Sequence, residues 1–211
     1  MIPMQNIHLL VATLNPGKVR EIRQFLDTLP LEVVGLDSLP RMAPCLEDGS
    51  TFEANARKKA IYYSSSADAL TMADDSGLAV DALEGEPGIF SARYLSETAS
   101  DEERYRSILE QMKNVPMAQR AARFVCCVAV ARHGEVLGVF HGSVEGRIGD
   151  EPKGSNGFGY DPIFVVPELG KTMAELNPAE KQEISHRGRA LRQLAAWLKS
   201  ATFSGGKGLK K

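Results

Sequence analysis

The chain has 211 residues, of which 43% are hydrophobic and 25% are charged, the composition of an ordinary soluble globular domain. Its formal net charge of −2 gives no general attraction to nucleic acid or to anionic membranes, so an anionic ligand needs a local basic cluster. No apolar run is long enough to span a bilayer and the N-terminus lacks the basic region of a signal peptide, so we expect a cytoplasmic protein without membrane or nucleic-acid partners.

The first predicted strand, over residues 7–12, leads into a helix through the segment Thr13-Leu14-Asn15-Pro16-Gly17-Lys18. Asn15 is a good N-cap and Pro16 suits the first helical position, after which apolar residues recur at helical spacing as far as Leu29. A strand-to-helix junction offers backbone N–H groups and the positive end of a helix dipole to an anion, and the lysine adds a charge. The segment lacks the glycine pattern of a Walker motif. A capped helix with one surface lysine and no ligand is an alternative explanation of the same residues.

A second strand is predicted over residues 32–36 and is followed by a loop. Ser50-Thr51-Phe52-Glu53 then has the pattern of a capping box and predicts a helix that runs to about Tyr63. Lys59 on this helix is placed to neutralise phosphate oxygens if its face meets a ligand, although most helix lysines are simply solvated.

Two adjacent acids, Asp74 and Asp75, follow a short apolar strand predicted over 69–72, and a Ser76-Gly77 turn is expected after them. Side-chain alternation sends one acid toward the crevice at the carboxyl end of the strand and the other to the opposite side. A carboxylate in such a crevice binds a divalent metal or accepts a proton from water, although most acid pairs in turns are solvated. Glu47 with one of the two aspartates would suit Mg²⁺, and no histidine or cysteine cluster predicts a zinc site.

The second half of the chain is predicted to contain more strand than helix. Its expected elements, in chain order, are a strand over 78–80, a loop over 84–88, a helix opened by the capping box Ser100-Asp101-Glu102-Glu103, strands over 122–132 and 135–144 joined by a His133-Gly134 turn, a strand over 162–166 and a closing helix over 187–199. No repeat and no dividing linker interrupts this order, which predicts a single α/β domain over 1–203. Residues 204–211 are rich in glycine and lysine and are expected to form a flexible tail.

The three cysteines, Cys45, Cys126 and Cys127, have no zinc-type spacing. Cys126 and Cys127 are neighbours in a predicted strand, so their side chains should point to opposite faces of the sheet. We expect buried, reduced thiols rather than a redox or metal site.

A glycine-rich loop over residues 154–161 contains Phe158 and Tyr160 and ends in an acid. Glycine lets the backbone approach a flat ligand closely, and an aromatic side chain there can stack on a base, although a hairpin loop with Phe158 in the core is the simpler alternative. Lys181 and the segment Ser185-His186-Arg187 offer donors suited to carbonyl oxygens or phosphate. Together with the segments above, these residues provide what a nucleoside triphosphate site requires.

With these motifs in this order, the sequence resembles the inosine triphosphate pyrophosphatase family, and within it the bacterial dITP/XTP pyrophosphatases. The residues that carry the resemblance are Val11 to Lys18, Glu47 to Ala56, Ala73 to Asp81, Pro87-Gly88-Ile89, Gly157 to Phe164 and Ile184 to Arg187. The resemblance implies an α/β fold with a long mixed sheet flanked by helices, two lobes with a substrate cleft between them, and a homodimer. It also implies Mg²⁺-dependent hydrolysis of ITP, dITP and XTP to the monophosphate and pyrophosphate.

The resemblance assigns roles to individual residues by their motif positions. Phosphate contacts are implied for Thr13, Leu14, Asn15, Pro16, Gly17, Lys18 and Lys59. Metal binding is implied for Glu47 and Asp75, with Asp75 also the general base on water and Ser76 a substrate contact. The base would be held by Phe158, Gly159, Tyr160, Asp161, Lys181, His186 and Arg187. The sequence departs from the family at Leu14, where glycine is usual, and at Asp48, where threonine is usual.

The chemistry of the predicted base site suits a 6-oxo purine, because His186 and Arg187 could donate to that oxygen while a 6-amino group would leave them unpaired. Guanine shares the 6-oxo group, so the way in which GTP is excluded stays open. A pyrophosphatase for pyrimidine or modified nucleotides is the nearest alternative, and a nucleotide sensor without turnover is another. The second acid beside the triphosphate disfavours a sensor, and the charge pattern disfavours an RNA-binding module.

Overall fold

The computed structural model describes residues 7–27, 29–38, 43–67 and 69–200. The tail expected over 204–211 lies outside the described residues. None of the helices in the described part of the chain combines the length and the hydrophobicity that a membrane span requires.

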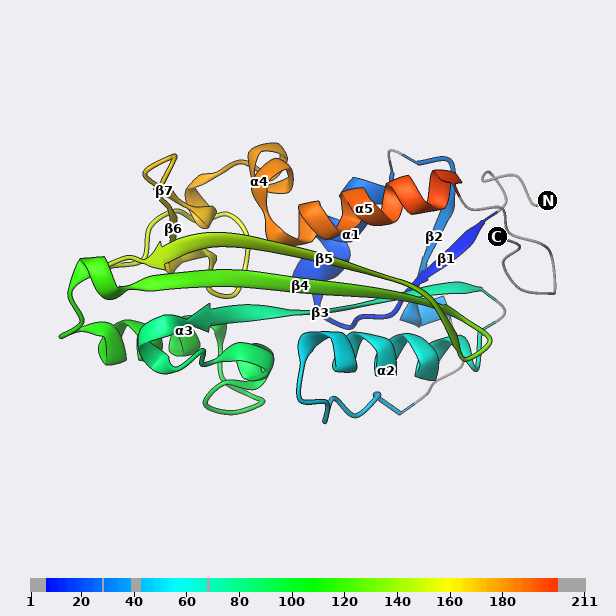
Figure 1. The fold of residues 1–211 in the computed structure, drawn as a ribbon, viewed down its shortest axis with the longest axis horizontal. Helices are drawn as coiled ribbons and strands as arrows, with labels where there is room; N and C mark the ends of the chain where they lie inside the picture. The colour runs from blue at the N-terminus through cyan, green and yellow to red at the C-terminus, as the bar shows by residue number, and fades with distance from the viewer. Residues whose placement is uncertain (1–6, 28, 39–42, 68, 201–211) are drawn as a thin grey trace. The chain divides into compact units, whose positions relative to one another are not determined.

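A seven-stranded mixed sheet forms the framework, with the strand order β2-β1-β3-β4-β5-β6-β7 (Figure 1). The strands are β1 (His8–Val11), β2 (Glu32–Gly35), β3 (Leu70–Val80), β4 (Ala121–Arg132), β5 (Glu135–Ile148), β6 (Phe164–Val166) and β7 (Lys171–Thr172). Strand β1 pairs in parallel with β2 and β3, whereas β6 pairs antiparallel with β5 and β7. The mixed sheet that the sequence predicts is therefore confirmed.

The chain divides into two compact units, each of which is built from segments distant in the sequence. The first unit comprises the described parts of Met1–Asp75, Cys127–His141 and Arg189–Lys211, and the second unit comprises Ser76–Cys126 and Gly142–Gly188. The single two-lobed domain over 1–203 stays a prediction.

In the first unit, helix α2 (Phe52–Ser64) covers one face of the strands, and α1 (Pro16–Leu26) and α5 (His186–Ser200) lie on the other (Figure 1). The core beneath α2 is built largely from small side chains on both surfaces, namely Ala73, Cys127, Ala129 and Ala131 on the strands, Ala12 just after β1, and Ala56 and Ala60 on the helix. Small residues let a helix lie close to a sheet, which brings the polar side chains at the edge of this contact near the strand backbone.

Helix α3 (Asp101–Met112) and the short helix α4 (Pro178–Ile184) belong to the second unit. Its hydrophobic core contains Ile108 and Met112 of α3, both fully buried, together with side chains of β3, β4, β5 and β6. The rings of Phe124 and Phe164 lie 4.4 Å apart between centroids within this core. Large side chains from several elements thus hold this unit together.

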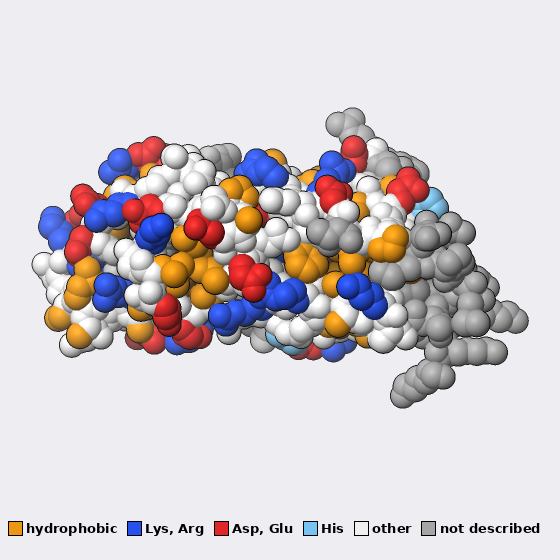
Figure 2. Space-filling view, turned by 90° about the horizontal axis from the view of Figure 1, so that it is seen from above, with side chains coloured by type: hydrophobic (Ala, Val, Ile, Leu, Met, Phe, Trp, Pro, Cys, Tyr) orange, Lys and Arg blue, Asp and Glu red, His pale blue; other side chains and the backbone are white. Residues whose placement is uncertain are grey.

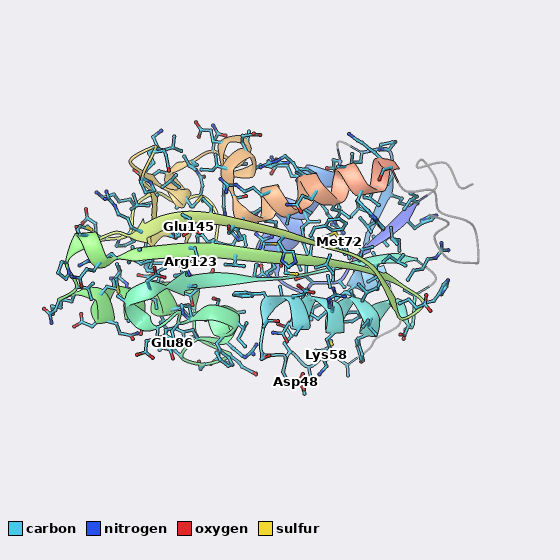
Figure 3. The ribbon with its side chains drawn as sticks, viewed as in Figure 1. Asp48, Lys58, Met72, Glu86, Arg123 and Glu145 are labelled. Carbon is cyan, nitrogen blue, oxygen red and sulfur yellow. The ribbon has the colours of Figure 1, made fainter. Side chains whose placement is uncertain are left out.

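Surface charge is mixed rather than segregated on the face shown in Figure 2, where acidic and basic side chains lie among one another. An example within the second unit is Arg123, whose guanidinium pairs with Asp81 at 2.6 Å and with Glu145 at 3.4 Å (Figure 3). Exposed pairs of this kind contribute only about 0–1 kcal/mol each to stability.

Most predicted helices and caps occur where the sequence indicates them. The side chain of Asn15 caps α1, and Ser100 with Glu103 forms a capping box at the start of α3. The turn between β4 and β5 is His133-Gly134, with φ of 50° and 81°, as a two-residue type I′ hairpin requires. Cys126 and Cys127 are buried, reduced thiols as expected, whereas Cys45 is only partly buried.

Strand β3 overturns the prediction of a strand that ends at Met72, because it continues unbroken through both aspartates to Val80. The expected Ser76-Gly77 turn is also wrong, since both residues lie inside the strand. Gly77 is required there for close approach rather than for a turn: a Cβ at this position would overlap Ser91 Oγ and would lie 2.5 Å from Gly88 O. A glycine that admits a neighbouring segment looks the same in sequence as one that bends the chain.

The capping box expected at Ser50 does not form, because Thr51 is the N-cap of α2 and accepts from the amide of Ala54. Glu53 therefore falls outside the N3 position and pairs with Arg57 at 2.6 Å instead. The sequence does not predict helix α4, since its seven residues are too few to show a helical period. The strand expected over 162–166 begins only at Phe164.

We predict that Ile108→Ala lowers the free energy of unfolding by about 2–5 kcal/mol, because it removes a fully buried side chain and leaves a cavity in the core of the second unit. The exposed neighbour on the same helix, Glu110, provides the control, and Glu110→Ala should change stability by less than about 1 kcal/mol. Denaturant titration of both variants measures the effect. Equal effects of the two changes would contradict this description of the core.

Candidate functional site

The junction between β1 and α1 is organised by local hydrogen bonds. The side chain of Asn15 accepts from the amide of Lys18 at 3.0 Å, and the hydroxyl of Thr13 accepts from the amide of Asn15 at 3.3 Å. Leu14 is 69% exposed, so its side chain meets solvent rather than the loop. The junction holds Lys18 at the start of α1, where the helix N-terminus favours an anion.

The two aspartates of β3 are both buried, and each meets a lysine from a different helix. Asp74 pairs with Lys18 of α1, and Asp75 pairs with Lys59 of α2 at 3.4 Å. Because α1 and α2 lie on opposite faces of the strands (Figure 1), the alternation predicted for the acidic pair is realised. The ammonium group of Lys59 also donates to the backbone carbonyl of Asp74 at 2.7 Å and to Glu47 at 3.1 Å.

The charges of this cluster shift one another's protonation. Burial raises the pKa of Asp75 above its ordinary value, although Lys59 and then Lys18 oppose the shift. Burial alone would lower the pKa of Lys59, but the carboxylates of Asp75, Glu47 and Asp74 outweigh it and the pKa is raised. Lys59 therefore stays cationic at neutral pH, and Asp75 is a stronger base than a solvated aspartate.

Two buried polar atoms beside this cluster have no hydrogen-bond partner among the described residues, Oδ2 of Asp75 and Nδ2 of Asn55. The other atom of the amide, Oδ1 of Asn55, accepts from the amide of Gly49 at 2.8 Å and fixes the loop that follows Glu47. A buried carboxylate oxygen without a partner costs free energy unless a ligand satisfies it. Asp75 thus has one oxygen on Lys59 and one oxygen without a hydrogen-bond partner among the described residues.

The donor chemistry fits a hard divalent cation that takes most of its ligands from elsewhere. Within the described ranges no group of three or more His, Cys, Asp or Glu side chains is arranged to hold a metal ion. Asp75 and Glu47 are two carboxylates joined through one ammonium group, and two carboxylates are enough when phosphate oxygens and water complete the shell. Asp48, the acid next to Glu47, is exposed and pairs with Lys58 (Figure 3).

In the second unit, the loop over residues 157–161 presents an aromatic ring to two cations. The ammonium group of Lys181 lies 5.0 Å from the ring centroid of Phe158, and the guanidinium carbon of Arg187 lies 5.6 Å from it. Lys181 also pairs with Asp161, and the same carboxylate accepts from the amide of Phe158 at 2.8 Å. The ring is half-buried, so the alternative in which Phe158 fills the core is not what the structure shows.

The remaining predicted base contacts are also held by this unit. His186 is buried and stacks on Phe124, with centroids 4.8 Å apart and planes inclined by 17°. Arg187 donates to the hydroxyl of Ser76 at 2.7 Å, which links the start of α5 to β3. A buried, fixed guanidinium of this kind is suited to directional recognition of an oxygen.

Tyr160 adds a third kind of contact to the loop. Its hydroxyl donates to the backbone carbonyl of Ser91 at 2.9 Å, and burial raises the pKa of the phenol, which keeps it protonated. The amide of Gly159 donates to the carboxylate of Asp101 at 2.7 Å.

The structure thus gathers the predicted residues into two sets. The first unit brings together Lys18, Glu47, Lys59 and Asp75, with Asp74 added. The second unit brings together Ser76, Phe158, Asp161, Lys181 and Arg187, beside His186 and Tyr160. Their individual roles in binding and catalysis stay predictions.

Sequence reasoning missed three residues that hold the second set in place, namely Ser91, Asp101 and Phe124. The sequence predicts Asp101 only as part of a helix cap. Its carboxylate reaches the loop across 58 positions of sequence, and no local pattern signals such a contact. The strand pattern predicts that Phe124 points into the core, but it does not predict that the ring stacks on His186.

A family model described as the Ham1 family matches residues 9–197 of this chain. The chain belongs to the Ham1 family. Among curated relatives, the dITP/XTP pyrophosphatase of Oceanobacillus iheyensis is 44% identical over 191 residues, which are 90% of this chain and 97% of the relative. That of Geobacter sulfurreducens is 48% identical over 183 residues, which are 87% of this chain and 92% of the relative.

Solved structures agree with the family assignment. The Ham1 protein of Staphylococcus aureus is 41% identical with a TM-score of 0.81, covering 92% of this chain and 98% of its own. A nucleoside-triphosphatase described as a dITP/XTP pyrophosphatase from Mycobacterium abscessus is 41% identical with a TM-score of 0.72, covering 89% of this chain and 98% of its own. The resemblance stated from the sequence and the α/β fold that it implies are confirmed.

The buried Asp75 carboxyl leads to a prediction about stability in the presence of a chelator. Because its pKa is raised in the native state, the contribution of this carboxyl to stability should fall as the pH rises from the ordinary value of 3.8 through the raised pKa. The Asp75→Asn variant has an amide that does not titrate, so it should gain stability relative to wild type over that window. Denaturant unfolding at a series of pH values measures the difference between the two proteins, and a difference independent of pH would contradict the burial argument.

Proposed function

We propose that this protein is a nucleoside triphosphate pyrophosphohydrolase that converts dITP, ITP and XTP to the monophosphate and pyrophosphate. The observation that carries the proposal is the buried Asp75, with one oxygen on Lys59, the other without a partner among the described residues, and a raised pKa. The family assignment and the curated names of relatives at 44–48% identity support a hydrolase of this class.

Release of pyrophosphate requires neutralised phosphate charge and an aligned water molecule more than covalent help from the protein. Lys18 and the N-terminus of α1 supply positive charge at the junction between β1 and α1, and the ammonium group of Lys59 supplies it beside Asp75. Asp75 is the general base in this proposal and accepts the proton of the attacking water, from a position that burial and the pair with Lys59 hold fixed. These residues hold the phosphates and activate the nucleophile.

Mg²⁺ is the cofactor that we propose, with Glu47 and Asp75 as the residues that would hold it. When bound, it would neutralise charge on the phosphate oxygens that share its coordination. The carboxylates would otherwise repel an anionic substrate, and Lys59 between them offsets only part of that repulsion.

The second unit supplies the purine contacts in this proposal. Phe158 offers a ring for stacking, and the side chains of His186 and Arg187 donate to the 6-oxo group. A 6-amino purine cannot accept these bonds and would leave buried donors unpaired, which disfavours ATP. A homodimer and a cytoplasmic location stay predictions of the sequence.

We predict that the wild-type protein releases pyrophosphate from dITP, ITP and XTP faster than from ATP, with activity lost in chelator. Asp75→Asn should lower kcat by about 10²–10⁴-fold, because the amide cannot accept the proton of water. Glu53→Gln, on the exposed part of α2, is the matched control and should retain wild-type activity. A nucleotide panel with pyrophosphate detection measures this, and near-normal turnover by Asp75→Asn would remove Asp75 from its role as base.

We predict that Arg187→Ala reduces the preference for ITP over ATP by about 5- to 150-fold, through slower ITP hydrolysis at an almost unchanged ATP rate. Loss of one buried donor to the 6-oxo group costs about 1–3 kcal/mol, and ATP has no equivalent bond to lose. The exposed Arg189, two residues along the same helix, provides the control as Arg189→Ala. Values of kcat/KM for both nucleotides, with melting curves, measure the effect. A lower Tm with an unchanged ITP/ATP ratio would show that Arg187 only braces the helix.

A further inference from the structure

The loop over residues 157–161 is fixed at the two amides that flank Phe158. The amide of Phe158 donates to Asp161 at 2.8 Å, and the amide of Gly159 donates to Asp101 at 2.7 Å. These amides lie on either side of the Phe158 Cα, so holding both fixes the direction in which the side chain leaves the backbone. Asp161 belongs to the loop itself, whereas Asp101 comes from a different element, the first residue of α3.

Asp101 is itself held by a second contact, on its own helix. Its other carboxylate oxygen, Oδ1, pairs with Arg104 at 3.3 Å, one turn further along α3. Arg104 is buried and donates to the backbone carbonyls of Tyr94 at 3.3 Å and Ser96 at 3.2 Å. The Asp101 side chain is 51% exposed, and its two oxygens contact a buried guanidinium on one side and the loop amide on the other.

Helix α3 does not require the carboxylate of Asp101 for its own start. Ser100 is the N-cap, and Ser100 with Glu103 completes a reciprocal capping box. Glu102 and Glu103 also place negative charge in the first turn, where it favours the helix dipole. The contact with Gly159 is a separate use of the Asp101 side chain.

Gly159 suits this contact in its backbone conformation. Its φ is +63°, which glycine adopts readily and other residues adopt at a cost, and a Cβ there would meet no heavy atom of the described residues within 4 Å. The positive φ therefore favours glycine at this position, whereas lack of space does not require it. In this conformation the amide of Gly159 donates to Asp101.

We propose that Asp101 is a positioning residue for purine binding, which acts by anchoring Gly159 and so setting the orientation of the Phe158 ring. The inference rests on the proposed function, because it takes Phe158 as the stacking surface for the base. In this proposal Asp101 acts through its contact with the loop rather than through a contact with the nucleotide. Because the base is remote from the bond that breaks, disorder of its platform weakens substrate and transition state equally and raises KM with little change in kcat.

The experiment compares wild type with Asp101→Ala, Asp101→Asn and Glu102→Ala, using kcat and KM for dITP and XTP. Asp101→Ala should raise KM about tenfold with kcat within about twofold, as expected from losing a hydrogen bond to a charged group. Asp101→Asn retains an oxygen that accepts from the Gly159 amide, so its KM should stay within about threefold of wild type. Glu102→Ala removes a neighbouring acid of the same first turn that pairs with Arg106 instead, and should match wild type.

Hydrogen exchange of the Gly159 amide, measured by NMR on the protein without nucleotide, reports on the anchor independently of activity. Exchange should be faster in Asp101→Ala and close to wild type in Asp101→Asn and Glu102→Ala. A wild-type KM in Asp101→Ala would overturn the proposal, as would a KM in Asp101→Asn as high as that of Asp101→Ala. Equal losses of Tm in Asp101→Ala and Glu102→Ala with unchanged KM would assign Asp101 to helix stability alone.

Failure of the proposed function gives a different result. If wild type hydrolyses neither dITP nor XTP, the pyrophosphatase assignment fails for every variant alike, while the exchange of Gly159 still shows whether Asp101 anchors the loop. If wild type is active and Asp101→Ala has the same KM and kcat, the assignment stands and the positioning role is wrong.

Discussion

The need to pair two buried carboxylates in the middle of one strand governs the first unit. Asp74 and Asp75 point to opposite faces of β3, and a buried charge without a partner costs several kcal/mol. One lysine must therefore reach the strand from each covering helix. The small side chains beneath α2 allow Lys59 to come close enough to bond the strand backbone as well. The position of α1, the position of α2 and the charge state of Asp75 all follow from this pairing.

The second unit differs in that it holds the half-buried aromatic ring of Phe158 at its loop over residues 157–161. A half-buried Phe158 has fewer core neighbours than a fully buried side chain, and its ring lies against Lys181 and Arg187. The loop that carries it is also held by polar contacts of its backbone with Asp101 and Asp161 and by the hydroxyl of Tyr160 on Ser91. Rigidity here depends on hydrogen bonds, whereas in the rest of the unit it depends on the packing of Ile108, Phe124 and their neighbours.

The sequence predicts those parts of the molecule whose cause is local. Asn15 caps α1 because its side chain reaches an amide three residues away, and the His133-Gly134 turn needs only its own two residues. Prediction fails where the cause is distant in the sequence. Glycine is needed at position 77 of β3 because Ser91 approaches the strand there, and no local pattern shows this. The same distinction holds at the candidate site, where motifs alone indicate the acids and the lysines. The pairing of Lys18 with Asp74 and of Lys59 with Asp75 depends on the position of the two helices on opposite faces of the sheet. Side-chain alternation along β3 predicts this pairing only once the helices have been placed on those faces.

The thiols offer a practical consequence of the burial pattern. Cys126 and Cys127 are fully buried on β4, and burial raises the pKa of Cys127 to about 12, so almost none of it is thiolate at neutral pH. Since only the thiolate reacts with alkylating reagents, the native fold shields this pair. Burial raises the pKa of the Cys45 thiol as well, but this side chain is partly exposed, and it lies two residues before Glu47. A maleimide dye added to the unmodified chain should therefore attach at Cys45, and this would place a fluorescent reporter close in sequence to Glu47, which we propose as a metal ligand, without introducing a single substitution.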